Sequence, residues 1–266
     1  MTKIRRQVQN MRIGTRVFLD KLKENTKYCC SQFHVLEIQD FVFPENLVYK
    51  VDALYKEYET LLNGFQGEIT IHGPYMDLNP ISMDTRIREL TLERYLQAVE
   101  AAKVFDSRWI VIHTYFSQIH NQEPWYQDYW IEENLKFWKK VIPVLEKEKK
   151  TIVLENVFDV NPSTIKELVD GLGSEFFKAC LDVGHCNVFS EESIKTWLEV
   201  LGERLKYLHL SDNNGKRDNH LPIGSGSIDF QEIANNLPKN RKDLIVISEA
   251  FCSPEEEIAG FNVLIS

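Results

Sequence analysis

Residues 207–230 read YLHLSDNNGKRDNHLPIGSGSIDF, and this stretch decides how the rest of the chain is interpreted. An apolar, strand-like run ends in a polar loop that carries His209, Asp218 and His220. The loop also contains three glycines, which give the backbone freedom to turn these side chains toward a common point. Imidazole and carboxylate groups are typical metal ligands, so the stretch predicts a metal site.

Strand-like runs of the same kind recur along the chain and alternate with amphipathic segments that have the periodicity of helices. Two of these segments, residues 85–105 and 130–149, are predicted to be single helices. Strict alternation predicts right-handed crossovers and a parallel sheet, and eight such units close into a barrel. The eight predicted strands are MRIGTRVF (11–18), HVLEIQD (34–40), EITIHGPY (68–75), WIVIHTYF (109–116), TIVLENVF (151–158), FKACLDVGH (177–185), LKYLHLSD (205–212) and DLIVISEAF (243–251).

Length and composition agree with this interpretation. The chain has 266 residues, of which 43% are hydrophobic and 27% charged, as in a globular α/β protein. We therefore expect a single (β/α)8 TIM barrel over residues 11–266, preceded by an N-terminal extension, residues 1–10. No apolar run is long enough to span a bilayer, and the first residues lack the apolar core of a signal peptide, so a cytoplasmic protein without membrane contact is expected.

Nine imidazole and carboxylate side chains lie at the ends of the predicted strands or in the loops that follow them. The carboxyl ends of barrel strands meet at one mouth, so these side chains are expected to gather there. Charged groups inside apolar runs are costly unless they are paired or bind a metal, which favours a divalent metal centre of zinc or manganese. The nine residues are His72, His113, Glu155, Asp182, His185, His209, Asp218, His220 and Glu249.

These motifs resemble the xylose isomerase-like TIM-barrel superfamily, which includes endonuclease IV (AP endonuclease family 2) and sugar phosphate isomerases and epimerases. The similarity runs from Met11 to about Phe251 and keeps the family's motif order. In endonuclease IV-like members the same nine positions hold three zinc ions. The resemblance implies one ion at His72, His113 and Glu155, a second at Glu155, Asp182, His209 and Glu249, and a third at His185, Asp218 and His220.

The epimerases of the superfamily are similar only in the inner part of this set. The resemblance implies one ion at Glu155, Asp182, His209 and Glu249, with Glu155 and Glu249 as the catalytic proton-transfer pair. His185 would then contact a substrate hydroxyl in the reaction instead of binding metal. Aromatic side chains near the mouth suit a small sugar, and Tyr75, Tyr115 and Trp125 are the expected substrate contacts.

Two chemistries therefore remain, with one to three divalent ions. The loop with Asp218 and His220 favours phosphodiester hydrolysis of abasic DNA or another phosphate ester, and Tyr75 with Met76 occupies the place of DNA-wedging residues. Against this, residues 40–50 lack the arginine-bearing insertion of the repair enzyme, and a net charge of −9 disfavours nucleic acid without excluding it. We favour isomerisation or epimerisation of a sugar, and a barrel that binds metal without catalysis is disfavoured because no ligand position is lost.

Overall fold

The computed structural model describes the chain except residues 1–10, 118–119, 121–122, 124, 238–240 and 265–266. The predicted N-terminal extension thus lies outside the described residues. Within the described part, no helix combines the length and the apolar character needed to cross a membrane.

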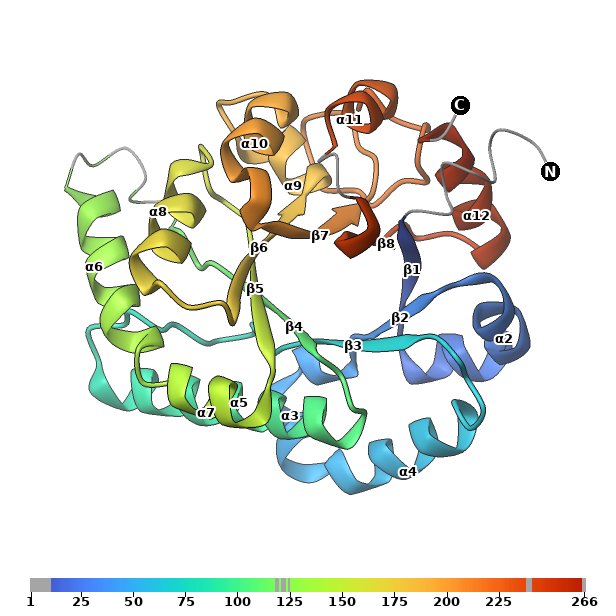
Figure 1. Cartoon of the computed structure of the whole chain (residues 1–266), viewed down its shortest axis with the longest axis horizontal. Coiled ribbons are helices and arrows are strands. Elements are labelled where there is room, and N and C mark those ends of the chain that lie inside the picture. The colour runs from blue at the N-terminus through green and yellow to red at the C-terminus, as the bar shows by residue number, and fades with distance from the viewer. Residues whose placement is uncertain (1–10, 118–119, 121–122, 124, 238–240, 265–266) are drawn as a thin grey trace.

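Eight parallel strands form a closed barrel, as the sequence predicts. Each strand pairs with the next one along the chain, and β8 pairs with β1 to close the ring, which Figure 1 shows in a view that looks into the barrel. The strands are β1 (Arg12–Val17), β2 (Val35–Ile38), β3 (Glu68–His72), β4 (Trp109–His113), β5 (Thr151–Glu155), β6 (Phe177–Asp182), β7 (Leu205–Leu210) and β8 (Ile245–Ser248).

The helices surround the ring of strands, where their apolar faces bury the outward side chains of the strands in one large core. Between β8 and the C-terminus, a capping box formed by Ser253 and Glu256 begins α12, which packs on β1 and α2 at the closing seam. The helices are α2 (Leu19–Gln32), α3 (Pro44–Tyr49), α4 (Val51–Leu61), α5 (Thr85–Val104), α6 (Tyr126–Trp138), α7 (Ile142–Glu148), α8 (Ser163–Leu172), α9 (Val183–Phe189), α10 (Ile194–Leu201), α11 (Phe230–Asn236) and α12 (Pro254–Val263), with short 3-10 turns at Asp40–Val42, Gly202–Arg204 and Arg241–Asp243.

One predicted helix is wrong in its extent. Residues 130–149 were expected to form one helix, but α6 begins earlier, at Tyr126, and ends at Trp138, before α7 begins at Ile142. Pro143 stands at the start of α7, where its missing N–H costs nothing, whereas inside a continuous helix it would break the hydrogen-bond ladder. The prediction for residues 85–105 is confirmed by α5.

The interior of the barrel explains the position of the site. A separate small cluster of buried side chains includes Val153 on β5, Cys180 on β6, Tyr207 on β7 and Ile247 on β8. Side chains of a strand alternate between its two faces, so the inward side chain that follows each of these lies two residues further along. The next inward residues are Glu155 on β5, Asp182 on β6, His209 on β7 and Glu249, which directly follows β8.

Candidate metal centre

The inner group consists of four side chains at the ends of neighbouring strands: Glu155, Asp182, His209 and Glu249. One ligand atom from each lies within 4.8 Å of the others, and all four residues are buried. His209 Nδ1 lies 3.2 Å from a Glu155 oxygen and 3.6 Å from a Glu249 oxygen. The strand register places Asp182 directly beside His209. The predicted second set of ligands is therefore brought together by the strands themselves.

The outer group consists of His185, Asp218 and His220, whose ligand atoms also lie within 4.8 Å of one another. Asp218 Oδ2 is 3.3 Å from His185 Nε2 and 2.8 Å from His220 Nε2. His185 is placed by α9, because Asp182 caps this helix by accepting a hydrogen bond from the His185 backbone N–H at 2.7 Å. The predicted third set of ligands is thus also assembled.

Asp212 holds the loop that carries Asp218 and His220. Its buried carboxylate accepts hydrogen bonds from four backbone N–H groups, those of Asn213, Gly224, Gly226 and Ile228. A side chain at Gly226 would meet this carboxylate at 2.4 Å, so the loop closes on Asp212 only because residue 226 is a glycine. Reciprocal backbone hydrogen bonds between Asp212 and Leu221 fold the intervening segment back on itself.

The first implied set of ligands is only partly assembled. His72 joins Glu155 and His209 in a third group, whereas His113 belongs to none of the three groups found in the described residues. His113 Nε2 does lie 3.5 Å from Glu155 Oε2, and His72 Nε2 lies 3.3 Å from the same oxygen. The His113 ring is stacked on Tyr75 with 4.3 Å between ring centroids, which helps to hold the imidazole beside the group.

In four of these histidines, one ring nitrogen contacts a fixed acceptor while the other faces a carboxylate. Nδ1 contacts a backbone carbonyl in three of them: Gly73 O for His72, Asn156 O for His185 and Glu249 O for His220, at 2.9–3.0 Å. In His209 it is Nε2 that contacts Glu37 Oε2, at 3.1 Å. Metal-binding histidines in proteins are usually held in this way, because the fixed N–H leaves the other nitrogen free to donate its lone pair.

The unsatisfied atoms of the inner group fit a divalent cation. Both carboxylate oxygens of Glu155, Oδ2 of Asp182 and Nδ1 of His209 are buried without a hydrogen-bond partner in the described residues. Buried polar atoms are normally paired, and a cluster of unpaired carboxylate oxygens and an imidazole nitrogen is the kind of donor set that could hold a divalent cation. The mixture of nitrogen and oxygen donors suits zinc or manganese.

The electrostatics of the groups also favour added positive charge. Burial acts to raise the pKa of Glu155, but the charge of His209 outweighs it and holds this pKa well below its ordinary value. Burial acts to lower the pKa of His185, but the charge of Asp182 and the hydrogen bond to Asp218 raise it to about 10. In contrast, burial lowers the pKa of His113 to about 3, so this ring is neutral.

Glu37 is a residue of the site that the sequence interpretation missed. It is fully buried on β2, and besides His209 it accepts a hydrogen bond from Tyr207 Oη at 2.6 Å and one from Gln39 Nε2 at 3.0 Å. Its signal in the sequence is the one that identified Glu155, a carboxylate within an apolar run, VLEI. Through its contact with Nε2, Glu37 holds the His209 ring so that Nδ1 faces Glu155 and Glu249 of the inner group.

The three aromatic residues expected to contact substrate lie at different distances from the groups. Tyr75 stacks on His113, and Tyr115 lies beside it with its hydroxyl donating to Pro74 O at 3.3 Å. Trp125 is half exposed at the start of α6, with its ring against Tyr126 and Tyr129. Tyr75 borders the groups directly, with its ring centroid 5.7 Å from that of His72, whereas Tyr115 adjoins them only by way of His113.

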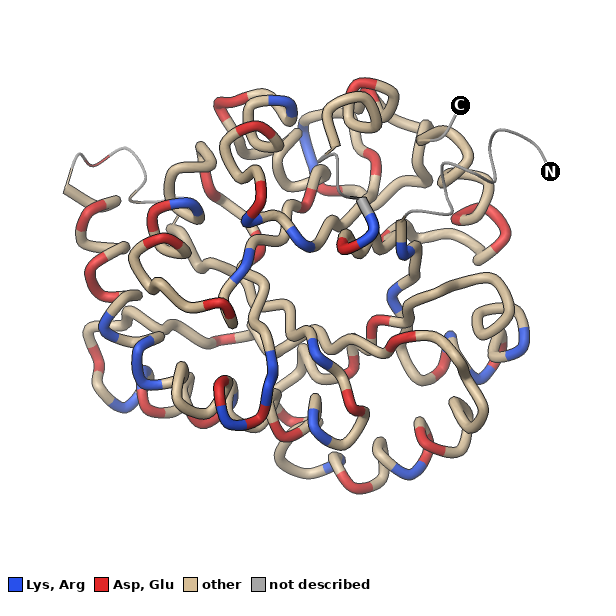
Figure 2. The backbone as a smooth tube through the Cα atoms, in the orientation of Figure 1, with Lys and Arg blue, Asp and Glu red and all other residues tan. Residues whose placement is uncertain are grey.

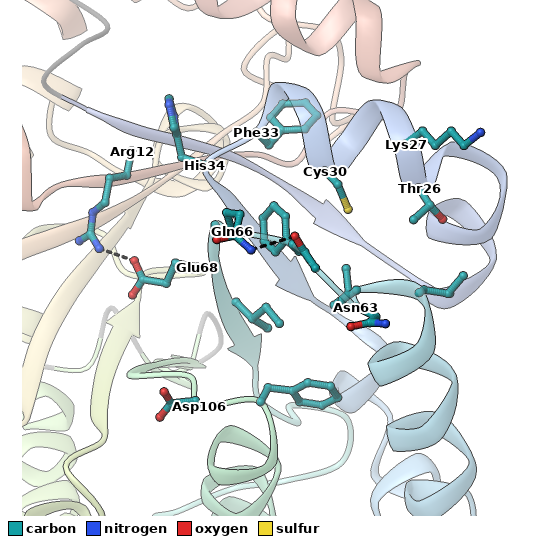
Figure 3. A pocket seen from close by; sticks show the side chains of 17 residues that line it. Arg12, Thr26, Lys27, Cys30, Phe33, His34, Asn63, Gln66, Glu68 and Asp106 are labelled. Carbon is teal, nitrogen blue, oxygen red and sulfur yellow. Dashed lines mark hydrogen bonds and ion pairs between the residues drawn. The ribbon is translucent and has the colours of Figure 1, made fainter.

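A cavity of about 1040 Å3 lies at the other end of the barrel (Figure 3). It is lined by residues at the amino ends of strands, among them Arg12 of β1 and Glu68 of β3, which form an ion pair, and His34 just before β2. None of the nine predicted ligands lines it. Catalytic groups of TIM barrels lie at the carboxyl ends of the strands, so this cavity is not the candidate active site.

Comparisons with known proteins agree with the fold. The family model described as xylose isomerase-like TIM barrel matches residues 33–263. An uncharacterized protein of Methanocaldococcus jannaschii is 29% identical over 223 residues, covering 81% of this chain and 72% of the relative. A probable endonuclease 4 from Natranaerobius thermophilus is 24% identical over 177 residues, covering 60% of this chain and 61% of that protein. Among solved structures, a D-tagatose 3-epimerase-like protein is 26% identical with a TM-score of 0.76, and 96% of each chain is covered.

Proposed function

Because the chain belongs to the xylose isomerase-like TIM-barrel family, we propose that it is a divalent-metal-dependent enzyme that isomerises or epimerises a small sugar or sugar derivative. The observation that carries this proposal is the inner group, in which Glu155, Asp182, His209 and Glu249 converge and the first three carry unpaired buried ligand atoms. A divalent ion bound there would polarise the oxygens of a ketose and make the adjoining C–H bond more acidic.

In this proposal Glu155 and Glu249 move the proton. Glu155 ends β5 and Glu249 directly follows β8, so they can face a substrate from two sides. In epimerisation, one glutamate would enter as the carboxylate and remove the proton from one face of the carbon, while the other would enter protonated and deliver its own proton to the opposite face. In isomerisation, a single glutamate would take the proton from one carbon and deliver it to the neighbouring carbon. Asp182 and His209 would serve as fixed ligands.

A small polar substrate suits the surroundings of the inner group. Tyr75 and Tyr115 would form one wall of the substrate site, with Trp125 further out. The chain is acidic overall, and Figure 2 shows Lys and Arg positions scattered among Asp and Glu positions along the outer helices. A protein that binds nucleic acid through phosphates needs clustered cations, so the charge distribution supports a small molecule.

Phosphodiester hydrolysis is the second candidate, and the outer group favours it. Several divalent ions close together can activate a water molecule and hold the attacking and leaving oxygens of a phosphate ester. His185, Asp218 and His220 would hold the additional ion, and the similarity to a probable endonuclease 4 supports this alternative. In the favoured proposal His185 contacts a substrate hydroxyl instead.

Metal analysis tests both candidates first. Protein purified without chelator is expected to carry about one equivalent of manganese or zinc if only the inner group is filled, whereas about three equivalents of zinc would favour hydrolysis. If no metal binds even after reconstitution, the central claim fails.

The reaction is then followed by NMR in D2O, where proton transfer replaces a carbon-bound proton of the ketose by deuterium. We expect Glu249→Gln to abolish this exchange while an exposed control, Glu59→Gln, retains it. Cleavage of an abasic DNA duplex that disappears in Glu249→Gln would replace the sugar assignment by the hydrolytic one.

A further inference from the structure

Arg16 lies in the mouth of the barrel, close to the end of β1. Two residues earlier on the same face, Gly14 packs against Val35 and Ile247 of the interior cluster. Because strand side chains alternate, Arg16 also points inward, one layer nearer to the metal-binding groups. A guanidinium in this position faces the space in which a substrate would bind.

The guanidinium of Arg16 has no carboxylate partner among the described residues. Its Nη1 donates one long hydrogen bond, 3.5 Å, to Gln39 Oε1, and its Cζ lies 4.2 Å from the centroid of the Phe251 ring. Arg12 at the other end of the same strand is instead paired with Glu68. Arginine offers five N–H donors in a planar fork, so Arg16 retains donors for a ligand.

Arg16 is separated from the inner group by one side chain. Gln39 accepts from Arg16 and donates through Nε2 to Glu37 Oε1 at 3.0 Å and to Glu249 Oε1. Gln39 is therefore fixed between the guanidinium and a carboxylate of the proposed proton-transfer pair. If one carbon of a ligand lies beside Glu249, the part of the ligand a few bonds away can lie beside Arg16.

A cavity of about 420 Å3 adjoins this position, lined by Arg16, Phe18, Lys21, Ala250, Phe251 and Cys252. The second cation in the lining, Lys21, is already bonded to the buried Glu257 at 2.8 Å. Arg16 is thus the cation of this cavity that remains available to an anion. The exposed Phe251 ring lies against the guanidinium and restricts its movement.

We propose that Arg16 binds an anionic group of the substrate, a phosphate ester or a carboxylate, at the end remote from the reacting carbon. The assignment rests on the proposed function, because it assumes that the reacting carbons lie between Glu155 and Glu249. The inner group is rich in carboxylates and repels an anion, so an anionic substrate needs a cation of its own beside it. Arginine is suited to this role because its fork matches both phosphate and carboxylate oxygens.

The alternative role of Arg16 is to neutralise the carboxylates of the inner group without contacting substrate. In that case, loss of its charge would change metal affinity and the binding of every sugar alike. In the proposed role, loss of the charge removes only the preference for an anionic sugar. The two roles are therefore separated by a comparison of ligands that differ only in one terminal group.

The experiment measures dissociation constants by calorimetry for D-fructose, D-fructose 6-phosphate and D-fructuronate, with protein treated with chelator and with protein loaded with manganese. These ketoses carry a hydroxyl, a phosphate or a carboxylate at the same end. We expect the wild-type protein to prefer at least one of the two anions to D-fructose by about 10- to 100-fold, the range for a charged hydrogen bond. Which of the two anions is preferred shows whether Arg16 binds a phosphate ester or a carboxylate.

Arg16→Gln is expected to remove this preference, and Arg16→Lys to restore part of it. Arg108→Gln is the matched control, because Arg108 is an exposed arginine that also stacks on an aromatic ring, Trp109, but precedes β4 at the opposite end of the barrel. It should leave the preference unchanged. Circular dichroism and thermal unfolding of each variant establish that the fold is intact.

The inference is overturned if wild-type protein shows no preference for either anion, or if Arg16→Gln retains the preference. It is also overturned if Arg16→Gln weakens binding of an abasic duplex while the sugar constants stay unchanged, since Arg16 would then serve a nucleic-acid phosphate. Absence of deuterium exchange with all three ketoses contradicts the proposed function instead, and the binding constants still decide the role of Arg16.

Discussion

The inner and outer groups of the candidate metal centre use the same kinds of ligand but are built differently. Glu155, Asp182 and His209 are the last or nearly the last residues of barrel strands, and they are fully buried. The outer ligands Asp218 and His220 lie on a loop, with side chains that are 20% and 16% exposed. The barrel therefore fixes the inner group, whereas a folded loop must fix the outer one.

The two groups also differ in which candidate chemistry requires them. The inner group is required by both candidate chemistries, because each uses a cation at Glu155 and its neighbours. The outer group is required only by hydrolysis with several ions. Variants that disable one group at a time therefore reveal which chemistry the protein performs, and the supports of each group, Glu37 and Asp212, can be tested separately.

The largest effect is expected for Glu155→Gln. Loss of a proton-transfer group that also binds metal should lower kcat/KM for the ketose by about 10²- to 10⁴-fold. Asp218→Asn, which alters only the outer group, should retain the activity within about 10-fold. Steady-state kinetics with metal content measured on the same samples check both values. Equal loss of activity in the two variants would contradict the separation and favour a mechanism that needs both groups.

The inner group was largely predictable from the sequence for a physical reason. A charged residue inside an apolar strand is costly, so residues such as Glu155 and His209 stand out without any knowledge of their neighbours. The closed barrel and its eight strands were predictable because strand and helix periodicities alternate clearly. Glu37 shows the same signal, but its role depends on His209, which is 172 residues away and becomes its partner only when β2 and β7 face each other across the barrel.

A smaller effect is expected for Glu37→Gln. The amide cannot provide the negative charge that accepts from His209 and Tyr207, so His209 should be less well oriented and less basic. Removing such a supporting carboxylate typically weakens metal binding by about 10- to 100-fold. Zinc affinity is measured against a chromophoric chelator in a His220→Ala background, in which the outer group is already disabled. An unchanged affinity, or an equal loss in the exposed control Glu59→Gln, would remove Glu37 from the site.

The outer group illustrates what could not be predicted. The sequence shows that Asp218 and His220 are near each other, but not that Asp212 binds four backbone N–H groups of the same loop. Such hydrogen bonds depend on the path of the backbone, which side-chain patterns do not specify. The split of residues 130–149 into two helices and the absence of His113 from the three groups depend on packing in the same way.

The smallest effect is expected for Asp212→Asn. The carboxylate accepts from Asn213 and Ile228 through Oδ1 and from Gly224 and Gly226 through Oδ2. An amide keeps one acceptor oxygen but turns its NH2 group toward two donors, which should lower the free energy of unfolding by about 1–3 kcal/mol.

We expect this substitution to weaken zinc binding at the outer group by roughly 10-fold, on the order of one charged hydrogen bond, and to leave the inner group unchanged. Urea unfolding and zinc titration of the same variant measure the two effects. Asp229→Asn is the matched control, because Asp229 caps α11 at the end of the same loop, where asparagine caps equally well. If Asp212→Asn weakens the inner and outer groups equally, the loop and the barrel are not independent supports, and the distinction between the two groups does not hold.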